Sequence, residues 1–235
     1  MKGFFVTGTD TGVGKTLITC ALILALQQRG LSVAAMKPIA AGTIDVDGVA
    51  MNEDVALFMA ATGNRHPMAA VNPYCFQEAI APHIAALHDG SHVEFDVIGT
   101  AYRQLARDAE VVLVEGAGGF LVPMSADESM ALIPAALRLP VVLVVGMRLG
   151  CLNHALLTVE AIRARGLTLA GWIANSASSE TMNARAENLS TLVRMIDAPL
   201  IGDVPHSGGG DTMQAACRAA TQLQSELLIP RSTTS

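Results

Sequence analysis

The amino-acid sequence has few aromatic and few charged side chains. Of its 235 residues, 4% are aromatic and 15% are charged, and the net charge is −6. Single-stranded nucleic acids stack on aromatic rings, and nucleic-acid-binding surfaces are basic. This composition supplies neither feature, and we therefore expect no nucleic-acid partner.

Cysteine is also scarce, and its spacing carries no motif. The four cysteines, Cys20, Cys75, Cys151 and Cys217, are far apart and form no C-x-x-C pair. This spacing excludes the dense disulfide framework of small secreted domains. We expect reduced thiols, most of them buried, in a protein of the cytoplasm.

Long apolar runs are absent as well. No segment reaches the roughly 20 apolar residues that a membrane helix needs. After Lys2 the apolar run is about four residues long, which is too short for a secretory signal. Hydrophobic residues nevertheless make up 51% of the chain. We expect them to form a core of a soluble cytoplasmic protein with no membrane partner.

The most informative stretch is residues 4–16, FFVTGTDTGVGKT. It predicts a buried strand, a glycine-rich turn and a helix that opens at Lys15 and Thr16, which is the layout of a phosphate-binding loop. The turn amides and the helix dipole attract an anion, Lys15 reaches the outer phosphates, and Thr16 binds Mg²⁺. Five residues separate Gly8 from Gly14, one more than in the common pattern. The alternative is an ordinary strand–turn–helix with a surface lysine.

Two further charged residues follow predicted strands. Lys37 follows a short strand at residues 32–36, and Glu115 follows a buried strand at residues 110–114. Ligands of open α/β sheets bind at the carboxyl ends of the strands, so both side chains are aimed at the rim of the phosphate loop. Glu115 lies where a carboxylate would hold Mg²⁺. The alternatives are an exposed lysine at a strand end and a glutamate that caps a turn.

Two more polar positions have alternative interpretations. A helix at residues 52–61, with Asn52 as its N-cap, places Asp54 in the first turn. Asp54 is then either a metal ligand or a residue that complements the helix dipole. Asn175 and Ser176 follow a strand at residues 168–174. They either hydrogen-bond a nucleotide base or cap the next helix.

Strands and helices alternate along the whole chain. The pattern predicts an α/β fold with a doubly wound, mostly parallel sheet of the P-loop NTPase type, in a single domain over residues 1–235. Residues 40–48 are predicted to be a loop, residues 72–83 a lid or substrate-side loop, and residues 212–227 a final helix. Other strands are predicted at residues 140–146 and 199–204, and other helices at residues 17–29, 95–107 and 149–165.

Six segments, in the same order, resemble the dethiobiotin synthase family. They are GTDTGVGKT at 8–16, KP at 37–38, VNPY at 71–74, VEGAGG at 114–119, LGCLNH at 149–154 and LAGWIAN at 169–175. The resemblance covers roughly residues 1–205. The phosphate loop with five intervening residues is itself a feature of this family.

The resemblance implies an enzyme of biotin biosynthesis, a cyclo-ligase. Such an enzyme converts 7,8-diaminopelargonate, CO₂ and ATP to dethiobiotin, ADP and phosphate. One amine forms a carbamate, the carbamate attacks the γ-phosphate to give a carbamic–phosphoric anhydride, and the second amine closes the ring. ATP is the co-substrate, Mg²⁺ is the cofactor, and the family works as a homodimer.

The resemblance also implies roles for individual residues. Lys15 and Lys37 are the expected catalytic residues, and Thr16, Asp54 and Glu115 the expected Mg²⁺ ligands. The expected ATP site consists of Gly12, Val13, Gly14, Lys15, Thr16, Leu17, Asp54, Glu115, Gly116, Ala117, Gly118, Asn175, Ser176, Val204, Pro205 and His206. The expected substrate site consists of Thr11, Ala41, Gly118, Leu149, Gly150, Cys151 and Asn153.

The chain departs from the usual family pattern at three places. Gly12 stands where many members have an acidic residue, Ala41 where many have Ser, and Ser176 where Asp is usual. Ser176 in place of a carboxylate predicts looser recognition of adenine.

Three other functions fit parts of the sequence. An amidotransferase-type synthase of corrinoid precursors shares the phosphate loop, but it usually carries an additional glutaminase domain, for which 235 residues leave no room. An ATPase switch of the partitioning or cell-division type usually has an additional lysine early in the loop, where this chain has Thr9, Asp10 and Thr11. A nucleotide-binding module without chemistry would not need Lys37 or Glu115.

Overall fold

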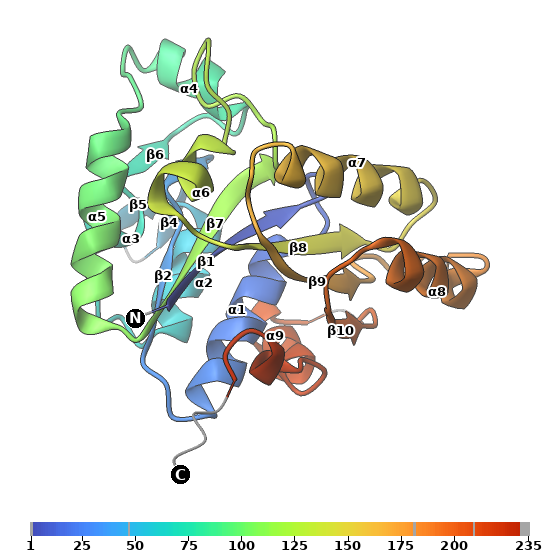
Figure 1. Cartoon of the computed structure of the whole chain (residues 1–235). Coiled ribbons are helices and arrows are strands. Elements are labelled where there is room, and N and C mark those ends of the chain that lie inside the picture. The colour runs from blue at the N-terminus through green and yellow to red at the C-terminus, as the bar shows by residue number, and fades with distance from the viewer. Residues whose placement is uncertain (1, 47, 181, 209, 231–235) are drawn as a thin grey trace.

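A parallel six-stranded sheet runs through the middle of the molecule (Figure 1). The computed structural model describes residues 2–46, 48–180, 182–208 and 210–230. The strands lie in the order β10-β9-β8-β1-β7-β2, and all neighbours are parallel. They are β1 (Lys2–Gly8), β2 (Val33–Met36), β7 (Val111–Gly119), β8 (Val141–Gly146), β9 (Leu169–Asn175) and β10 (Leu200–Val204). The predicted doubly wound parallel sheet is confirmed.

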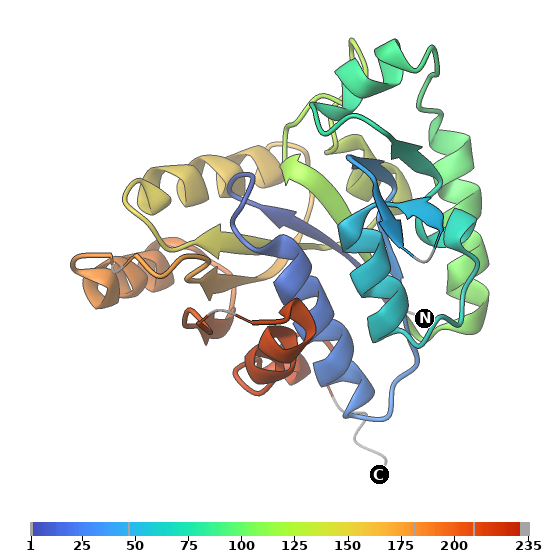
Figure 2. The same ribbon diagram turned by 180° about the vertical axis from the view of Figure 1, so that it is seen from behind.

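Helices cover both faces of this sheet. Figure 2 shows α1 (Lys15–Gln27), α2 (Glu53–Ala61) and α9 (Thr212–Ala220) in front of it. On the other face lie α5 (Phe95–Asp108), α6 (Leu132–Leu137) and α7 (Cys151–Arg163), and α8 (Arg185–Met195) packs against α7. Of the helices in the described residues, none combines the length and the apolar character that crossing a membrane requires.

The chain between β2 and α5 forms a small group of elements beside the main sheet. The short strands β3 (Ile39–Ala41) and β6 (Tyr74–Phe76) pair in parallel, and β4 (Ile44–Val46) and β5 (Val49–Met51) form a hairpin. Two short helices, α3 (Met68–Val71) and α4 (Pro82–His88), complete it. The loop predicted at residues 40–48 was therefore wrong in part, because strands of three residues are too short to show an alternating pattern.

Two further element boundaries differ from prediction. Strand β7 runs through Glu115 to Gly119 and still pairs there with Gly8, so Glu115 lies within the strand and not after its end. The predicted final helix stops at Ala220, because Leu223 turns back to pair with Gly202, and a 3₁₀ turn, η1 (Ser225–Leu227), follows. Both differences come from pairing between distant segments, which local sequence does not reveal.

The core consists of two clusters of buried apolar side chains, and the larger one includes residues of α1 and of α5. Helix α1 is apolar almost all round, and Ile18, Leu22 and Leu26 have no exposed surface. It is enclosed by the sheet, α2 and α9, which explains its lack of a polar face. Trp172 of β9, the only tryptophan of the chain, is also fully buried.

Close packing between β9 and β10 gives a test of this fold. A Cβ atom at Gly171 would lie 2.6 Å from Cδ1 of Ile201 and 2.9 Å from the carbonyl oxygen of Pro199. We expect Gly171→Ala to lower the free energy of unfolding by about 1–3 kcal/mol through overpacking. Denaturant titration monitored by Trp172 fluorescence measures this loss.

Gly99→Ala in α5 is the control. The new Cβ would come closest, at 3.3 Å, to the flexible end of Arg103, and alanine favours a helix interior by up to about 1 kcal/mol. Equal destabilisation by both variants would contradict the packing described here.

Candidate functional site

The phosphate loop joins β1 to α1 at the carboxyl edge of the sheet. Gly12 and Gly14 have φ values of 73° and 82°, in the left-handed region that favours glycine. Gly14 is the N-cap of α1, and no side chain caps this helix start. The first amides of α1 therefore remain available to an anion, where the helix dipole also favours negative charge.

Val13 anchors this loop to the sheet. Only 2% of its surface is exposed. A Cβ atom at Gly8 would lie 2.6 Å from Cγ2 of Val13, and one at Gly146 would lie 2.7 Å from Cγ1. Asn175 at the end of β9 donates its amide to the carbonyl oxygen of Val13 at 2.8 Å. Gly8 and Gly146 thus leave the space that the Val13 side chain fills, and this packing holds the loop against the sheet.

A buried cluster of charges lies beside the loop. Lys37 Nζ is 2.6 Å from Asp54 Oδ2 and 2.7 Å from Glu115 Oε1, and Glu115 is fully buried. The Thr16 hydroxyl lies 2.7 Å from Asp54 Oδ1 and 3.1 Å from Glu115 Oε1. Thr19 donates to the second oxygen of Glu115. The chain has three lysines, and two of them, Lys15 and Lys37, are buried at this site.

Electrostatics favour the charged forms of Lys37 and Asp54. Burial opposes the charge on Lys37, but attraction to Glu115 and Asp54 outweighs it and raises the pKa of Lys37. Burial likewise opposes the charge on Asp54, but Lys37 and Thr16 hold its pKa below the ordinary value. The pKa of Lys15 is lowered, mainly by burial, with Glu115 opposing and Lys37 reinforcing the shift. An anion beside Lys15 would relieve this penalty.

The oxygen atoms of this cluster fit Mg²⁺. Thr16, Asp54 and Glu115 offer hydroxyl and carboxylate oxygens, the hard ligands that this ion prefers. The described residues contain no group of three or more His, Cys, Asp or Glu side chains that could hold a metal. The cluster therefore suits an ion that keeps water and takes phosphate oxygens as its remaining ligands.

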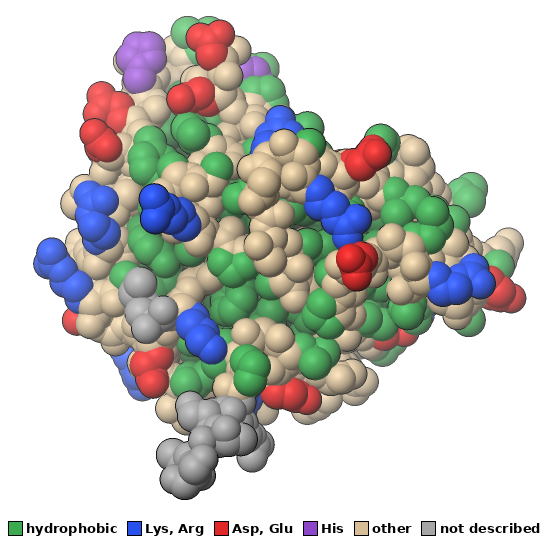
Figure 3. All heavy atoms as spheres, in the orientation of Figure 1, with side chains coloured by type: hydrophobic (Ala, Val, Ile, Leu, Met, Phe, Trp, Pro, Cys, Tyr) green, Lys and Arg blue, Asp and Glu red, His purple; other side chains and the backbone are tan. Residues whose placement is uncertain are grey.

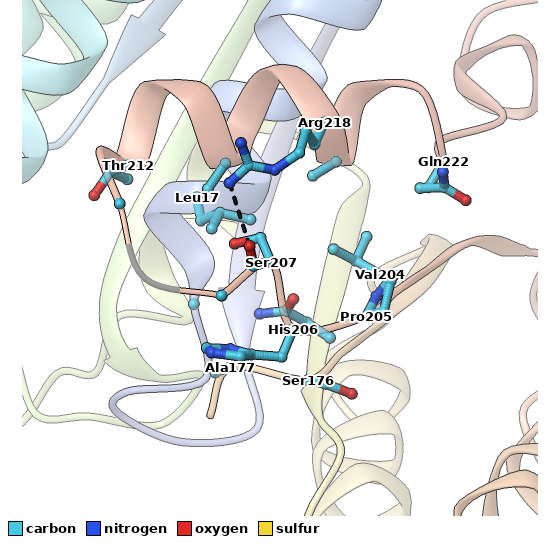
Figure 4. Close-up of a pocket in the computed structure, with 16 residues that line it drawn as sticks. Leu17, Ser176, Ala177, Val204, Pro205, His206, Ser207, Thr212, Arg218 and Gln222 are labelled. Atoms are coloured by element: carbon cyan, nitrogen blue, oxygen red, sulfur yellow. Dashed lines mark hydrogen bonds between the residues drawn. The ribbon is translucent and has the colours of Figure 1, made fainter. Parts of the chain in front are cut away.

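Two cavities meet at the phosphate loop. One, of about 780 Å³, is lined by the loop, Lys37, Asp54 and residues 79–82, among others. The other, of about 490 Å³, lies between the loop, the ends of β9 and β10, and α9 (Figure 4). Gly14 lines both, so the phosphate loop connects them.

Most residues expected from the sequence line one of these cavities. The larger cavity includes Thr11, Gly12, Gly14, Lys15, Thr16, Lys37, Ala41, Asp54 and Gly118. The smaller includes Gly14, Leu17, Asn175, Ser176, Val204, Pro205 and His206. Gly116 instead packs against the ring of Phe5. A Cβ atom at Gly116 would lie 2.8 Å from Cζ of this ring, so the ring occupies the space that glycine leaves free. Ala117, the next residue of β7, is partly buried against the core.

The expected substrate residues at the start of α7 are among the lining residues of neither cavity. Leu149 is 95% exposed, and Asn153 borders a separate surface hollow with Arg163 and Met195. Gly150 is the N-cap of α7 with a φ of 95°, and no side chain caps this helix start. Cys151 is the first helical residue. The preceding Arg148 pairs with Asp10 of the phosphate loop, although this helix start lines neither cavity.

The sequence did not point to several residues of the site. Thr19 lies one helical turn after Lys15, a spacing that could have indicated its approach to Glu115. Val122, Ala79 and Ile80 border the larger cavity, but no local pattern marks them. Arg218 of α9 borders the smaller cavity, and only the packing of α9 against α1 brings it there.

The Val13 anchor yields a direct test. We expect Gly146→Ala to push Val13 and to weaken MgADP binding about tenfold, because the loop amides move away from the phosphates. Val13→Ala in the same chain removes the clashing methyl groups and should restore most of the affinity. Calorimetric titration measures both, and an unchanged affinity in Gly146→Ala would refute the anchor.

Solved structures share this fold at low sequence identity. The septum site-determining protein MinD of Pyrococcus horikoshii, complexed with Mg-ADP, superposes with a TM-score of 0.59 at 15% identity, covering 97% of this chain and 96% of that one. A ParA family ATPase of Chlorobium tepidum gives a TM-score of 0.53 at 16% identity, covering 98% and 93%. These similarities confirm the predicted P-loop NTPase fold.

Sequence comparisons are more specific. A family model described as an AAA domain matches residues 2–211. The ATP-dependent dethiobiotin synthetase BioD of Aromatoleum aromaticum is 49% identical over 215 residues, covering 92% of this chain and 95% of that protein. The protein of the same description from Nitrosospira multiformis is 48% identical over 210 residues, covering 89% and 91%. The chain therefore belongs to the dethiobiotin synthetase family.

Proposed function

We propose that this protein converts 7,8-diaminopelargonate, CO₂ and ATP to dethiobiotin, ADP and phosphate. One substrate amine attacks CO₂ and loses a proton to form a carbamate. A carbamate oxygen then attacks the γ-phosphorus of ATP, and ADP leaves. The second amine attacks the carbonyl carbon of the mixed anhydride, and phosphate leaves as the ureido ring closes. The family membership and the chemistry of the larger cavity support this reaction.

The main support for this proposal is the position of Lys37. Its ammonium group lies in the same cavity as Lys15 and the phosphate loop. A carbamate that attacks the γ-phosphate must bring two anions together, and a fixed cation between them lowers this repulsion. Lys37 lies within 2.7 Å of two carboxylates, so it can exchange one of them for the incoming oxyanion without leaving the site.

Other residues of the cluster position ATP. The loop amides and Lys15 bind the phosphates, and the smaller cavity takes the base, between Asn175 and His206. Thr16, Asp54 and Glu115 would hold Mg²⁺. When bound, the ion neutralises phosphate charge during phosphoryl transfer.

The apolar part of the lining of the larger cavity suits the aliphatic part of the substrate. Ala79, Ile80, Pro82 and Val122 line the cavity together with the two lysines. A substrate with amines at one end and a hydrocarbon chain matches this mixed lining. Thr11, Ala41 and Gly118 also line the cavity and would contact the substrate.

We also propose that the protein works in the cytoplasm as a homodimer of single-domain subunits. Hydrophobic side chains gather over α7 and α8 (Figure 3), where Leu149, Leu157, Val193 and Met195 are 50–95% exposed. Exposed apolar patches of this kind mark interaction surfaces. A second copy would cover them and let the uncapped start of α7 meet the substrate carboxylate of its neighbour.

Phosphate release from MgATP tests the reaction. With bicarbonate present, release should depend on added 7,8-diaminopelargonate and on Mg²⁺. We expect Lys37→Gln to lower kcat by about 100-fold or more, because the charge near the reacting oxygens is lost. Lys2→Gln is the matched control, since Lys2 is an exposed lysine at the start of β1.

Binding of MgADP shows whether the Lys37→Gln variant is folded. The proposed reaction would be refuted if phosphate release does not need the diamine and persists in a folded Lys37→Gln variant. This result would indicate an ATPase switch instead.

A further inference from the structure

The cavity assigned to the nucleotide base has no acidic side chain among the described residues that line it. Its cationic side chain is Arg218 of α9, which extends toward the loop after β10 (Figure 4). The exocyclic amine of adenine is a hydrogen-bond donor and needs an acceptor. The lining side chains thus include a strong cationic donor but no carboxylate acceptor for that amine.

Asn175 already uses one of its two amide N–H donors. An asparagine that reads adenine accepts from the 6-amino group and donates to N7 with its amide nitrogen. Here one amide N–H donates to the carbonyl oxygen of Val13 at 2.8 Å. The side-chain oxygen and the second N–H remain for a base, and the bond to Val13 fixes the direction in which they can be offered.

Ser176 is engaged by a neighbouring ion pair. Its hydroxyl oxygen accepts a hydrogen bond from Nε of Arg185 at 3.0 Å. The same guanidinium holds both carboxylate oxygens of Asp203, with Nη1 3.0 Å from Oδ2. Arg185 thus pairs with the carboxylate of Asp203 and uses one acceptor site of the Ser176 hydroxyl, which weakens both as acceptors for an amine.

Arg218 has donors to spare. Its Nη2 atom donates to the carbonyl oxygen of Ser207 over a long 3.4 Å, the dashed line in Figure 4. A guanidinium carries five N–H groups in a fixed fork. This fork matches two adjacent acceptors, as O6 and N7 of guanine provide, whereas adenine presents N7 beside a donor.

We propose that Arg218 contacts the base and that the site binds guanosine nucleotides as well as adenosine nucleotides. The inference rests on the proposed function, because it takes this cavity as the base site of the ATP-dependent reaction. The amide of Asn175 favours adenine, and the fork of Arg218 favours guanine. Because these contacts oppose each other, the two bases differ in affinity by about tenfold or less.

Equilibrium titration with MgADP and MgGDP tests this inference. In the unchanged protein the two dissociation constants should lie within about tenfold of each other. Arg218→Met should weaken MgGDP relative to MgADP by about fivefold or more. Arg218→Lys should lose the same preference, because lysine keeps the charge and lacks the fork. Arg194→Met, at an exposed arginine of α8, is the matched control.

Two results would overturn the inference. They are an adenine preference above about tenfold in the unchanged protein, and an equal loss of both affinities in Arg218→Met. The titration needs no diamine, so a failed ring-closing reaction with both nucleotides bound would refute the proposed function and leave this inference intact. Failure of MgGDP alone to bind would refute this inference only, whereas failure of MgADP to bind would refute both.

Discussion

The site depends on Lys37 being shared between Asp54 and Glu115. This contact joins the end of β2 to the start of α2 and to the middle of β7, and Thr16 adds the start of α1. Removing one partner of a buried ion pair costs about 3–5 kcal/mol, because an uncompensated charge stays in the interior. Exposed pairs such as Arg163 with Asp197 contribute far less. The cluster therefore holds four elements in the geometry that the proposed chemistry needs.

The same arrangement divides the site between two tasks. Adjacent strands β1, β7 and β2 bring the phosphate loop, Glu115 and Lys37 together where charge moves in the proposed reaction. Strands β9 and β10 line the cavity proposed for the base, and α9 closes it. Val13 links the two halves, since it is packed against β8 and hydrogen-bonded to Asn175 of β9.

The sequence predicted the parts of this site that depend on strand order. Lys37 and the phosphate loop follow strands of one parallel sheet, so their convergence follows from the topology alone. The sequence could not decide whether Asp54 is a metal ligand or complements the helix dipole. Its approach to Lys37 depends on how α2 packs, and its position in the first turn of α2 does not reveal this. The role of Arg218 could not be predicted, because residues 205–211 show no sequence pattern that indicates where α9 packs. The strands β3 to β6 were missed because three residues are too few to show an alternating pattern.

The most direct test of the Lys37 cluster is the free energy of unfolding of two variants at neutral pH. The account predicts that Lys37→Met loses about 3–5 kcal/mol. It also predicts that Glu115→Gln in the same chain restores about half of this loss or more, because the buried carboxylate no longer lacks its partner. A loss below about 1 kcal/mol in Lys37→Met, or no recovery in the double variant, would contradict the account.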